Sequence, residues 1–325
     1  MRILRRRDVE RLLTPRGARE AMRAAFVALA KGGTFMPPRS YIEMERFGGS
    51  AVFMPAFVDP LDALGLKAVS IYGANPTKHG LPSILGSLLL FDTKTGETLA
   101  LMDAAPITAL RTAAVSALAT DFLAREDAEV AGFLGAGVQA RSHATALREV
   151  RPVTKLLAHS RTSANAEAFA RWASQELGLE AHALSTPKEV VTRSDIVTTA
   201  TPSPTPVLKG AWLPEGVHLN VIGSGPAHEV DGAAYARATR VVVDLLDHCL
   251  LEARDIMACT KDGTVSKEDI AELGDLIVGR AKGREGPGEI TLFRSIGLAM
   301  EDAAAAKLLY DRAVREKVGT ELAFP

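Results

Sequence analysis

Residues 132–143 read GFLGAGVQARSH, and this stretch decides the fold. Gly135, Gly137 and Ala140 form a GxGxxA pattern that follows an apolar run and precedes residues with helical spacing. Glycine inside a regular element loses packing and costs conformational entropy, so a glycine-rich corner indicates a need for space. A tight turn from a strand into a helix explains the first glycine, and a phosphate close to the backbone explains the second. A turn without any ligand is the alternative, because a short glycine pattern alone is weak evidence.

Strands and helices alternate around this corner. Apolar runs typical of strands occupy 128–134, 154–160, 195–201, 217–223 and 239–245, and helical patterns occupy 139–150 and 163–177. Continuous apolar strands separated by helices indicate a parallel sheet covered on both faces. In that context the glycine pattern predicts a Rossmann-type, doubly wound domain that binds a dinucleotide, with the pyrophosphate at the helix N-terminus. The candidate cofactor-binding residues at the corner are Gly135, Ala136, Gly137, Val138 and Gln139.

The chain before this domain has a different pattern. A capped helical segment at 14–33 precedes strand-like runs at 41–44, 51–58, 65–73, 83–92 and 97–103, the last two joined by a hairpin at Lys94, Thr95 and Gly96. Helical periodicity then covers 107–124, and a last helix is expected within 295–318. We predict an α/β protein in two domains. A discontinuous α+β domain for substrate binding and dimerisation takes 1–123 and 299–325, and the Rossmann NAD(P)-binding domain takes 124–298.

Composition excludes several classes of protein. The 325 residues are 47% hydrophobic, which fills two cores, and a formal charge of -1 implies no bulk attraction to nucleic acid or to an anionic membrane. The start MRILRRRDVE lacks the apolar core of a signal peptide, and no stretch is long and apolar enough for a membrane span, so a cytoplasmic protein is expected. Cys249 and Cys259 are too few for a disulfide framework, and no metal-ligand spacing occurs. We expect buried thiols and no metal.

The end of the second strand predicts which nicotinamide cofactor binds. NAD enzymes commonly place an acidic residue there to hold the ribose hydroxyls. This chain has Ser160, Arg161 and Thr162, which suit a 2'-phosphate through charge-assisted hydrogen bonds. NADP(H) is therefore the preferred cofactor and NAD(H) a possible one, unless Arg161 is simply an exposed loop residue.

Three cationic residues of the first domain lie next to or within apolar stretches of the sequence. Arg39 precedes a strand, Lys67 lies inside an apolar strand, and Arg111 lies in an apolar helical run. Lysine and arginine are almost never fully buried unless paired, so Lys67 and Arg111 need an anion. An internal carboxylate such as Asp103 is one answer. Together the three cations suggest a site for a carboxylate substrate.

At these residues the sequence resembles the ornithine cyclodeaminase and mu-crystallin family, which includes an archaeal alanine dehydrogenase and cyclic ketimine reductases. The resemblance rests on MPPR, GLKAVSIYGANP, TALRTAA, GFLGAGVQA, HLNVIGS followed by EVD, and TLFRSIGLAMED, in this order over nearly the whole chain. It implies a homodimer in which the split domain pairs with its twin beside a Rossmann domain. It also implies that Arg39, Lys67 and Arg111 hold the substrate carboxylate, with Ser83 near the nicotinamide. Thr112 and Ser224 complete the candidate cofactor-binding residues.

Two departures from the family pattern separate the candidate activities. The segment GSGPAHEVD has Ser224 or Gly225 where ornithine cyclodeaminase looks to need an aspartate, and Val52 stands where that enzyme is acidic. Without these acids the ammonium groups of a diamino acid would be unpaired in a desolvated pocket. Asp231 is the nearest substitute, but the N-cap of the following helix is its more natural role.

We therefore predict an NAD(P)H-dependent reductase of small cyclic 2-imino acids. Arg39 and Arg111 would fix the carboxylate, and Lys67, as the catalytic residue, would stabilise or protonate the developing amine. The alternatives are ornithine cyclodeaminase, alanine dehydrogenase and, in another class, a protein that binds NADPH and a small ligand without turnover. Cations already neutralised by the protein's own carboxylates would count against any enzymatic assignment.

Overall fold

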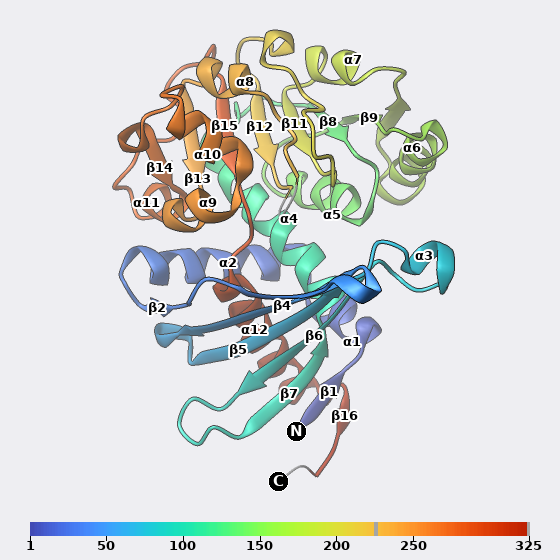
Figure 1. Ribbon diagram of the computed structural model, residues 1–325, viewed down its shortest axis with the longest axis vertical. Coiled ribbons are helices and arrows are strands. Elements are labelled where there is room, and N and C mark those ends of the chain that lie inside the picture. The colour runs from blue at the N-terminus through green and yellow to red at the C-terminus, as the bar shows by residue number, and fades with distance from the viewer. Residues whose placement is uncertain (224–226, 324–325) are drawn as a thin grey trace. The chain divides into compact units, whose positions relative to one another are not determined.

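The computed structural model describes residues 1–223 and 227–323, and its contacts divide the chain into two compact units (Figure 1). Unit 1 comprises Met1–Arg111 and Leu298–Pro325, and unit 2 comprises Thr112–Gly297. The boundary falls inside the helix α4 (Ala104–Leu123), at whose end the sequence placed it. The predicted α/β class with a discontinuous first domain is confirmed.

Unit 1 is built around a mostly antiparallel sheet. Its strands are β1 (Arg2–Leu4), β2 (Thr34–Phe35), β3 (Ser40–Met44), β4 (Gly49–Val58), β5 (Ala63–Ile71), β6 (Ile84–Phe91), β7 (Thr98–Asp103) and β16 (Thr320–Glu321). Its other helices are α1 (Arg6–Leu12), α2 (Pro15–Ala30), α3 (Asn75–Lys78) and α12 (Ala299–Glu316). The order is β16-β1-β7-β6-β5-β4-β2, with β3 on β4, and only β1 and β7 run parallel. The expected hairpin joins β6 and β7, where the Asp92 carboxylate accepts hydrogen bonds from the backbone N–H groups of Lys94 and Thr95.

One face of this sheet is packed against α12. The buried side chains alternate along β4 and β5, so that Met54, Ala56 and Lys67 share a face with Gly65. A Cβ on Gly65 would lie 3.2 Å from Ala303 in α12, which shows that the glycine permits close contact between strand and helix. The helix therefore presents its first turn to the strand that carries Lys67.

Unit 2 is the doubly wound domain that the sequence predicts. Its strands are β8 (Val130–Leu134), β9 (Lys155–His159), β10 (Glu180–Ala183), β11 (Ile196–Thr199), β12 (His218–Val221), β13 (Arg240–Val243), β14 (Ile270–Glu272) and β15 (Thr291–Arg294). Its helices are α5 (Val138–Leu147), α6 (Ser163–Leu177), α7 (Pro187–Thr192), α8 (Gly232–Arg237), α9 (Leu246–Glu252), α10 (Arg254–Lys261) and α11 (Leu273–Ile277). All strands are parallel in the order β10-β9-β8-β11-β12-β15-β13-β14. The order reverses between β8 and β11, which is where ligands bind in open sheets of this type.

Candidate functional site

The first candidate site is an ionic cluster buried in unit 1. Lys67 is 3% exposed, and its Nζ lies 2.6 Å from Oδ2 of Asp302 in α12 and 3.5 Å from Oγ1 of Thr108 in α4. The register of the sheet places it between Met54 and Leu88. A lysine in this apolar row is tolerated because a carboxylate faces it.

Arg111 joins the same cluster from α4. Its Nε lies 3.2 Å from Oδ1 of Asp302, and its Nη1 lies 2.7 Å from Oε2 of Glu301. The other oxygen of Glu301 accepts a hydrogen bond from the backbone N–H of Leu298 at 2.9 Å, which caps α12. Two adjacent acidic residues in the first turn of α12 therefore neutralise two cations from different elements.

The pKa values within the cluster reflect burial and pairing. Burial lowers the pKa of Lys67 from its ordinary 10.5 to about 8, and the positive charges of Arg111 and Arg39 add to this, while Asp302 opposes it. Burial raises the pKa of Asp302, but Arg111 and Lys67 outweigh it and hold that pKa below its usual value. With its pKa lowered to about 8, Lys67 loses its proton closer to neutral pH than an ordinary lysine does.

The structure brings all three predicted cations into one neighbourhood but corrects the source of the anion. Arg39 lies just before β3, partly exposed, and is close enough for its charge to lower the pKa of Lys67. The internal carboxylate suggested by the sequence was Asp103, and that was wrong, because Asp103 pairs with Arg6 at 3.5 Å. The true partners are Glu301 and Asp302, which lie about 190 residues beyond Arg111 in the chain.

The second candidate site is the glycine corner of unit 2. Gly135 has φ +105° and donates its N–H to the carbonyl of His159, and a Cβ there would lie 2.4 Å from the carbonyl oxygen of Ala200. Gly137 is exposed as the N-cap of α5, and a Cβ added there would meet no atom within 4 Å, so the backbone is open to a ligand. Val138 is 69% exposed, and Oε1 of Gln139 is buried without a hydrogen-bond partner among the described residues. These features fit a dinucleotide pyrophosphate at the start of α5.

The ends of three neighbouring strands meet at this corner. Ser160, Arg161 and Thr162 follow β9 directly, and the last two are exposed. Across β8, the loop after β11 is held by Glu229, whose carboxylate accepts hydrogen bonds from the backbone and hydroxyl of Thr201. The same carboxylate accepts the N–H of Gly223 at 2.7 Å, which ties the end of β12 to the end of β11. The sequence did not single out Glu229 for this role.

The other residues that the sequence singled out lie at separate places in the structure. Thr112 is buried in α4, and Ser83 precedes β6 with its carbonyl accepting the N–H of Tyr72. Ser224 lies outside the described residues. Asp231 is the N-cap of α8, as expected, and accepts the N–H of Ala234. His143 lies on α5, the helix that begins at the glycine corner, and its Nε2 lies 2.9 Å from Oγ of Ser116 in α4.

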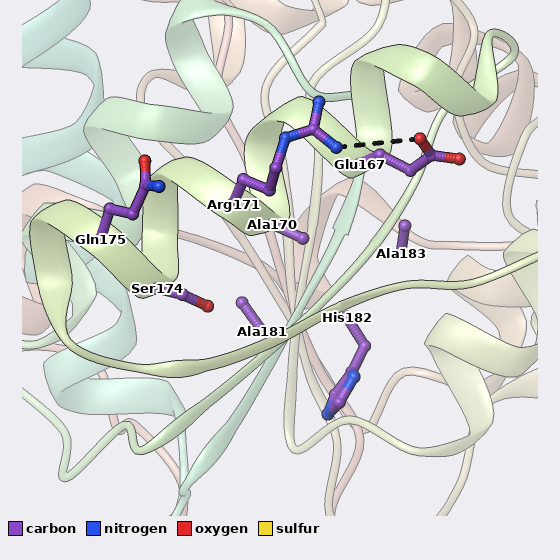
Figure 2. A pocket seen from close by; sticks show the side chains of 8 residues that line it. All are labelled: Glu167, Ala170, Arg171, Ser174, Gln175, Ala181, His182 and Ala183. Carbon is purple, nitrogen blue, oxygen red and sulfur yellow. Dashed lines mark ion pairs between the residues drawn. The ribbon is translucent and has the colours of Figure 1, made fainter.

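Other features of the described residues lie apart from these two sites. Figure 2 shows a surface pocket between α6 and β10, with Glu167 and Arg171 in an ion pair of 3.9 Å, and no predicted site residue lines it. Both cysteines are buried and free, as expected. Within 1–223 and 227–323 no cluster of metal-ligating side chains occurs, and no helix is long and apolar enough to cross a membrane.

Comparison with known proteins decides the family. The model of the ornithine cyclodeaminase/mu-crystallin family matches residues 1–317. The chain belongs to this family. Among its relatives, the Delta(1)-pyrroline-2-carboxylate reductase of Bacillus cereus is 37% identical over 294 residues, 90% of each chain.

Solved structures of family members are closely similar. The Delta(1)-pyrroline-2-carboxylate reductase of Thermococcus litoralis, in complex with NADH and L-proline, has 42% identity and a TM-score of 0.95, covering 99% of this chain and 100% of that chain. An archaeal alanine dehydrogenase dimer with bound NAD has 35% identity and a TM-score of 0.92, covering 100% and 99%. These two relatives are a reductase that binds NADH and a dehydrogenase that binds NAD.

Membership of the ornithine cyclodeaminase/mu-crystallin family corrects one expectation. We expected that three cations, each neutralised by the protein's own carboxylates, would count against an enzyme, and Lys67 and Arg111 are so neutralised in a chain whose relatives are enzymes. Neutralisation of these two is no argument against an enzyme, because a buried cation needs a counter-ion whether or not it also meets a substrate. The acidic pair Glu301–Asp302, immediately before the run AAAA, was the available signal, since charges next to a buried alanine face need partners.

Proposed function

We propose that this chain is an NAD(P)H-dependent reductase of small cyclic 2-imino acids such as 1-pyrroline-2-carboxylate and 1-piperideine-2-carboxylate. The observation that carries the proposal is the buried pair Lys67 and Arg111 with Arg39 beside it, in a chain 37% and 42% identical to two pyrroline-2-carboxylate reductases. Charged donors held in a desolvated site bind a carboxylate strongly.

Each partner in the reaction has a place in the proposal. The nicotinamide supplies the hydride, and the residues that would hold its dinucleotide are Gly135 to Gln139 at the start of α5. Lys67 donates a proton at Nζ to the developing amine, directly or through water. Arg39 and Arg111 orient the carboxylate, so that the imine carbon is held in one position.

Val52 supports imine reduction over the cyclisation of ornithine. Its side chain is 5% exposed on the α12 face of β4, where it provides no charge for a second ammonium group. Alanine dehydrogenase is the second candidate, because the archaeal enzyme of that name is 35% identical over the whole chain.

One set of assays separates these activities. Purified chain is mixed with NADPH or NADH and either a cyclic imine, or pyruvate with ammonia, and with NAD and ornithine in a third arm. We expect loss of nicotinamide absorbance with the cyclic imines at a kcat/KM at least about 100-fold above that with pyruvate and ammonia. Proline formation from ornithine, or a preference for pyruvate, would replace the proposed activity by the corresponding alternative.

We further propose that NADPH is preferred over NADH. Arg161 and Thr162 are exposed after β9, where the 2' position of the adenosine ribose lies in domains of this type. Arg161→Ala is expected to raise KM for NADPH about 10-fold or more and to leave KM for NADH unchanged. An equal effect on both cofactors, or none on either, contradicts the preference.

We also propose a homodimer formed through unit 1. The face of its sheet opposite α12 carries a row of half-exposed apolar side chains from four adjacent strands. These are Phe53, Phe57, Leu64, Leu66, Leu89, Phe91 and Leu101. Contiguous apolar patches of this kind mark protein interfaces, and a relative 35% identical is a dimer.

A further inference from the structure

The first turn of α12 contains a carboxylate that no substrate role accounts for. Asp302 is 1% exposed and uses its two oxygens separately, Oδ2 toward Lys67 at 2.6 Å and Oδ1 toward Arg111 at 3.2 Å. A carboxylate has a fixed distance between its oxygens, so this bridge sets the spacing between an ammonium from β5 and a guanidinium from α4.

We propose that Asp302 is a positioning residue for the reduction: its carboxylate holds the Lys67 ammonium and the Arg111 guanidinium at one fixed separation, so that the substrate carboxylate meets a preformed pair of donors. This inference rests on the proposed function and extends it to a residue of α12. Asp302 acts through Lys67 and Arg111, and it is not itself a substrate ligand.

The bridge is rigid because α12 is anchored at both sides of Asp302. Glu301 fixes the helix start through the N–H of Leu298, and Ala303 packs against Gly65 of β5. Side chains held by packing and by further hydrogen bonds keep their geometry when a ligand binds. The separation of the two donors therefore does not depend on the substrate.

The bridge also places charged groups in the core, where their desolvation costs free energy. Replacing a buried ion pair by apolar side chains of similar volume is often neutral or stabilising. Lys67 sits between Met54 and Leu88 on a face that is otherwise apolar, so stability alone does not require a charge there. The retained charges therefore fit a role in binding and proton donation.

Removal of the Asp302 charge has a specific electrostatic consequence for Lys67. The groups that face its ammonium are Asp302 from α12, Arg111 and the Thr108 hydroxyl from α4, and Arg39 from the segment before β3. Among these described groups, Asp302 supplies the negative charge. Without it the neutral form of Lys67 is favoured, because burial and the positive charges of Arg111 and Arg39 still lower its pKa.

The test compares Asp302→Asn with Glu301→Gln in the full-length chain. Both variants neutralise a buried carboxylate in the same helical turn, but Asp302 forms the ion pair with Lys67, whereas Glu301 pairs with Arg111. In pH profiles of kcat/KM for 1-pyrroline-2-carboxylate, Asp302→Asn is expected to move the alkaline limb about one to three pH units lower. It is also expected to lower kcat/KM at neutral pH at least about 10-fold, whereas Glu301→Gln leaves the limb in place.

A second variant covers the case in which Asp302→Asn does not fold. Asp302→Glu keeps the charge but lengthens the bridge by one methylene, so the limb should stay while kcat/KM falls at least about 10-fold through a changed donor spacing. Wild-type kcat/KM in Asp302→Glu overturns the proposal, and so does an unshifted limb in folded Asp302→Asn.

The pKa of Lys67 can also be measured without turnover. In chain labelled with ¹³C-lysine, the Cε resonance that disappears in Lys67→Arg is titrated in wild type and in Asp302→Asn. A lower midpoint in the variant supports the bridge even if the chain reduces no cyclic imine, which separates this inference from the proposed function. Equal midpoints overturn it.

Discussion

Lys67 is expected to make the proposed reduction depend on pH. Its pKa of about 8 is set mainly by burial, so the ammonium, which is the proposed proton donor, predominates below pH 8 and is lost above it. Since kcat/KM reports groups of the free enzyme, we expect kcat/KM for imine reduction to fall about tenfold per pH unit above about pH 8. A pH series at constant ionic strength measures this.

The assignment of that limb has a direct control. Arginine does not titrate in this range, so the residual activity of Lys67→Arg should show no limb near pH 8. A limb that persists unchanged in Lys67→Arg belongs to another group or to the imine itself, and then Lys67 is not the proton donor.

Removal of the ammonium tests the same residue at fixed pH. Lys67→Met fits the apolar row between Met54 and Leu88, and Arg111 still pairs with Asp302. We expect kcat to fall at least about 100-fold, the range found for loss of a general acid. Binding of NADPH, followed by its fluorescence, should be unaffected, and near-normal kcat would refute the role of Lys67.

At the scale of single residues, the sequence predicted the cation of each buried ion pair but not its carboxylate partner. A cation in an apolar run is visible because burial of an unpaired charge is forbidden, so Lys67 and Arg111 stood out. The sequence marks Glu301 and Asp302 as acidic residues that need partners, but it does not show that Lys67 and Arg111 are those partners. Both lie at a helix start, and only the packing of α12 on β5 turns them into the counter-ions.

Elements with a clear period or a continuous apolar run were predicted, but the buried strand β15 was not. The capped helix α2 and the β6–β7 hairpin follow from local patterns. The four-residue β15 lies fully buried between β12 and β13, although its sequence TLFR offers no alternation and contains an arginine. That arginine, Arg294, is buried because Asp255 of α10 pairs with it at 3.0 Å, a contact that sequence spacing does not reveal.

The contact between β5 and α12 gives a prediction about a whole element. An added Cβ at Gly65 would lie 3.2 Å from both Cα and Cβ of Ala303, so the helix backbone must shift. Overpacking of this kind costs about 1–3 kcal/mol, and we expect Gly65→Ala to lower the free energy of unfolding in urea by that amount. Because α12 carries Asp302, kcat/KM should fall as well.

Gly288→Ala is the matched control for this substitution. Nothing lies within 4 Å of a Cβ at Gly288, so its stability should be unchanged or slightly higher. If Gly65→Ala behaves like Gly288→Ala in both stability and activity, α12 is not held by close packing at this point.

For the whole molecule, the division into two units explains why one chain carries two kinds of pattern. Unit 2 alternates strands and helices because every parallel strand needs a crossover connection. Unit 2 is inserted into the sequence of unit 1. The last helix of unit 1, α12, therefore supplies Glu301 to the ionic cluster from 190 residues beyond Arg111. The sequence shows where the pattern of strands and helices changes. It does not show the contacts between the first and last segments of a discontinuous domain.

The apolar face of unit 1 leads to the last prediction, which concerns assembly. Leu66 and Leu89 face each other in register near the middle of that face, so a charge at either position would be buried in a dimer but solvated in a monomer. Leu89→Lys is therefore expected to convert a dimer into a single chain of 34.5 kDa in sedimentation equilibrium, because the long side chain can reach water only when the partner is absent. Ala164→Lys, on an exposed position of α6, adds the same charge without touching this face and should leave the dimer intact. A wild-type chain that sediments as a monomer at micromolar concentration, or a Leu89→Lys variant that remains dimeric, would show that this face is not the subunit interface.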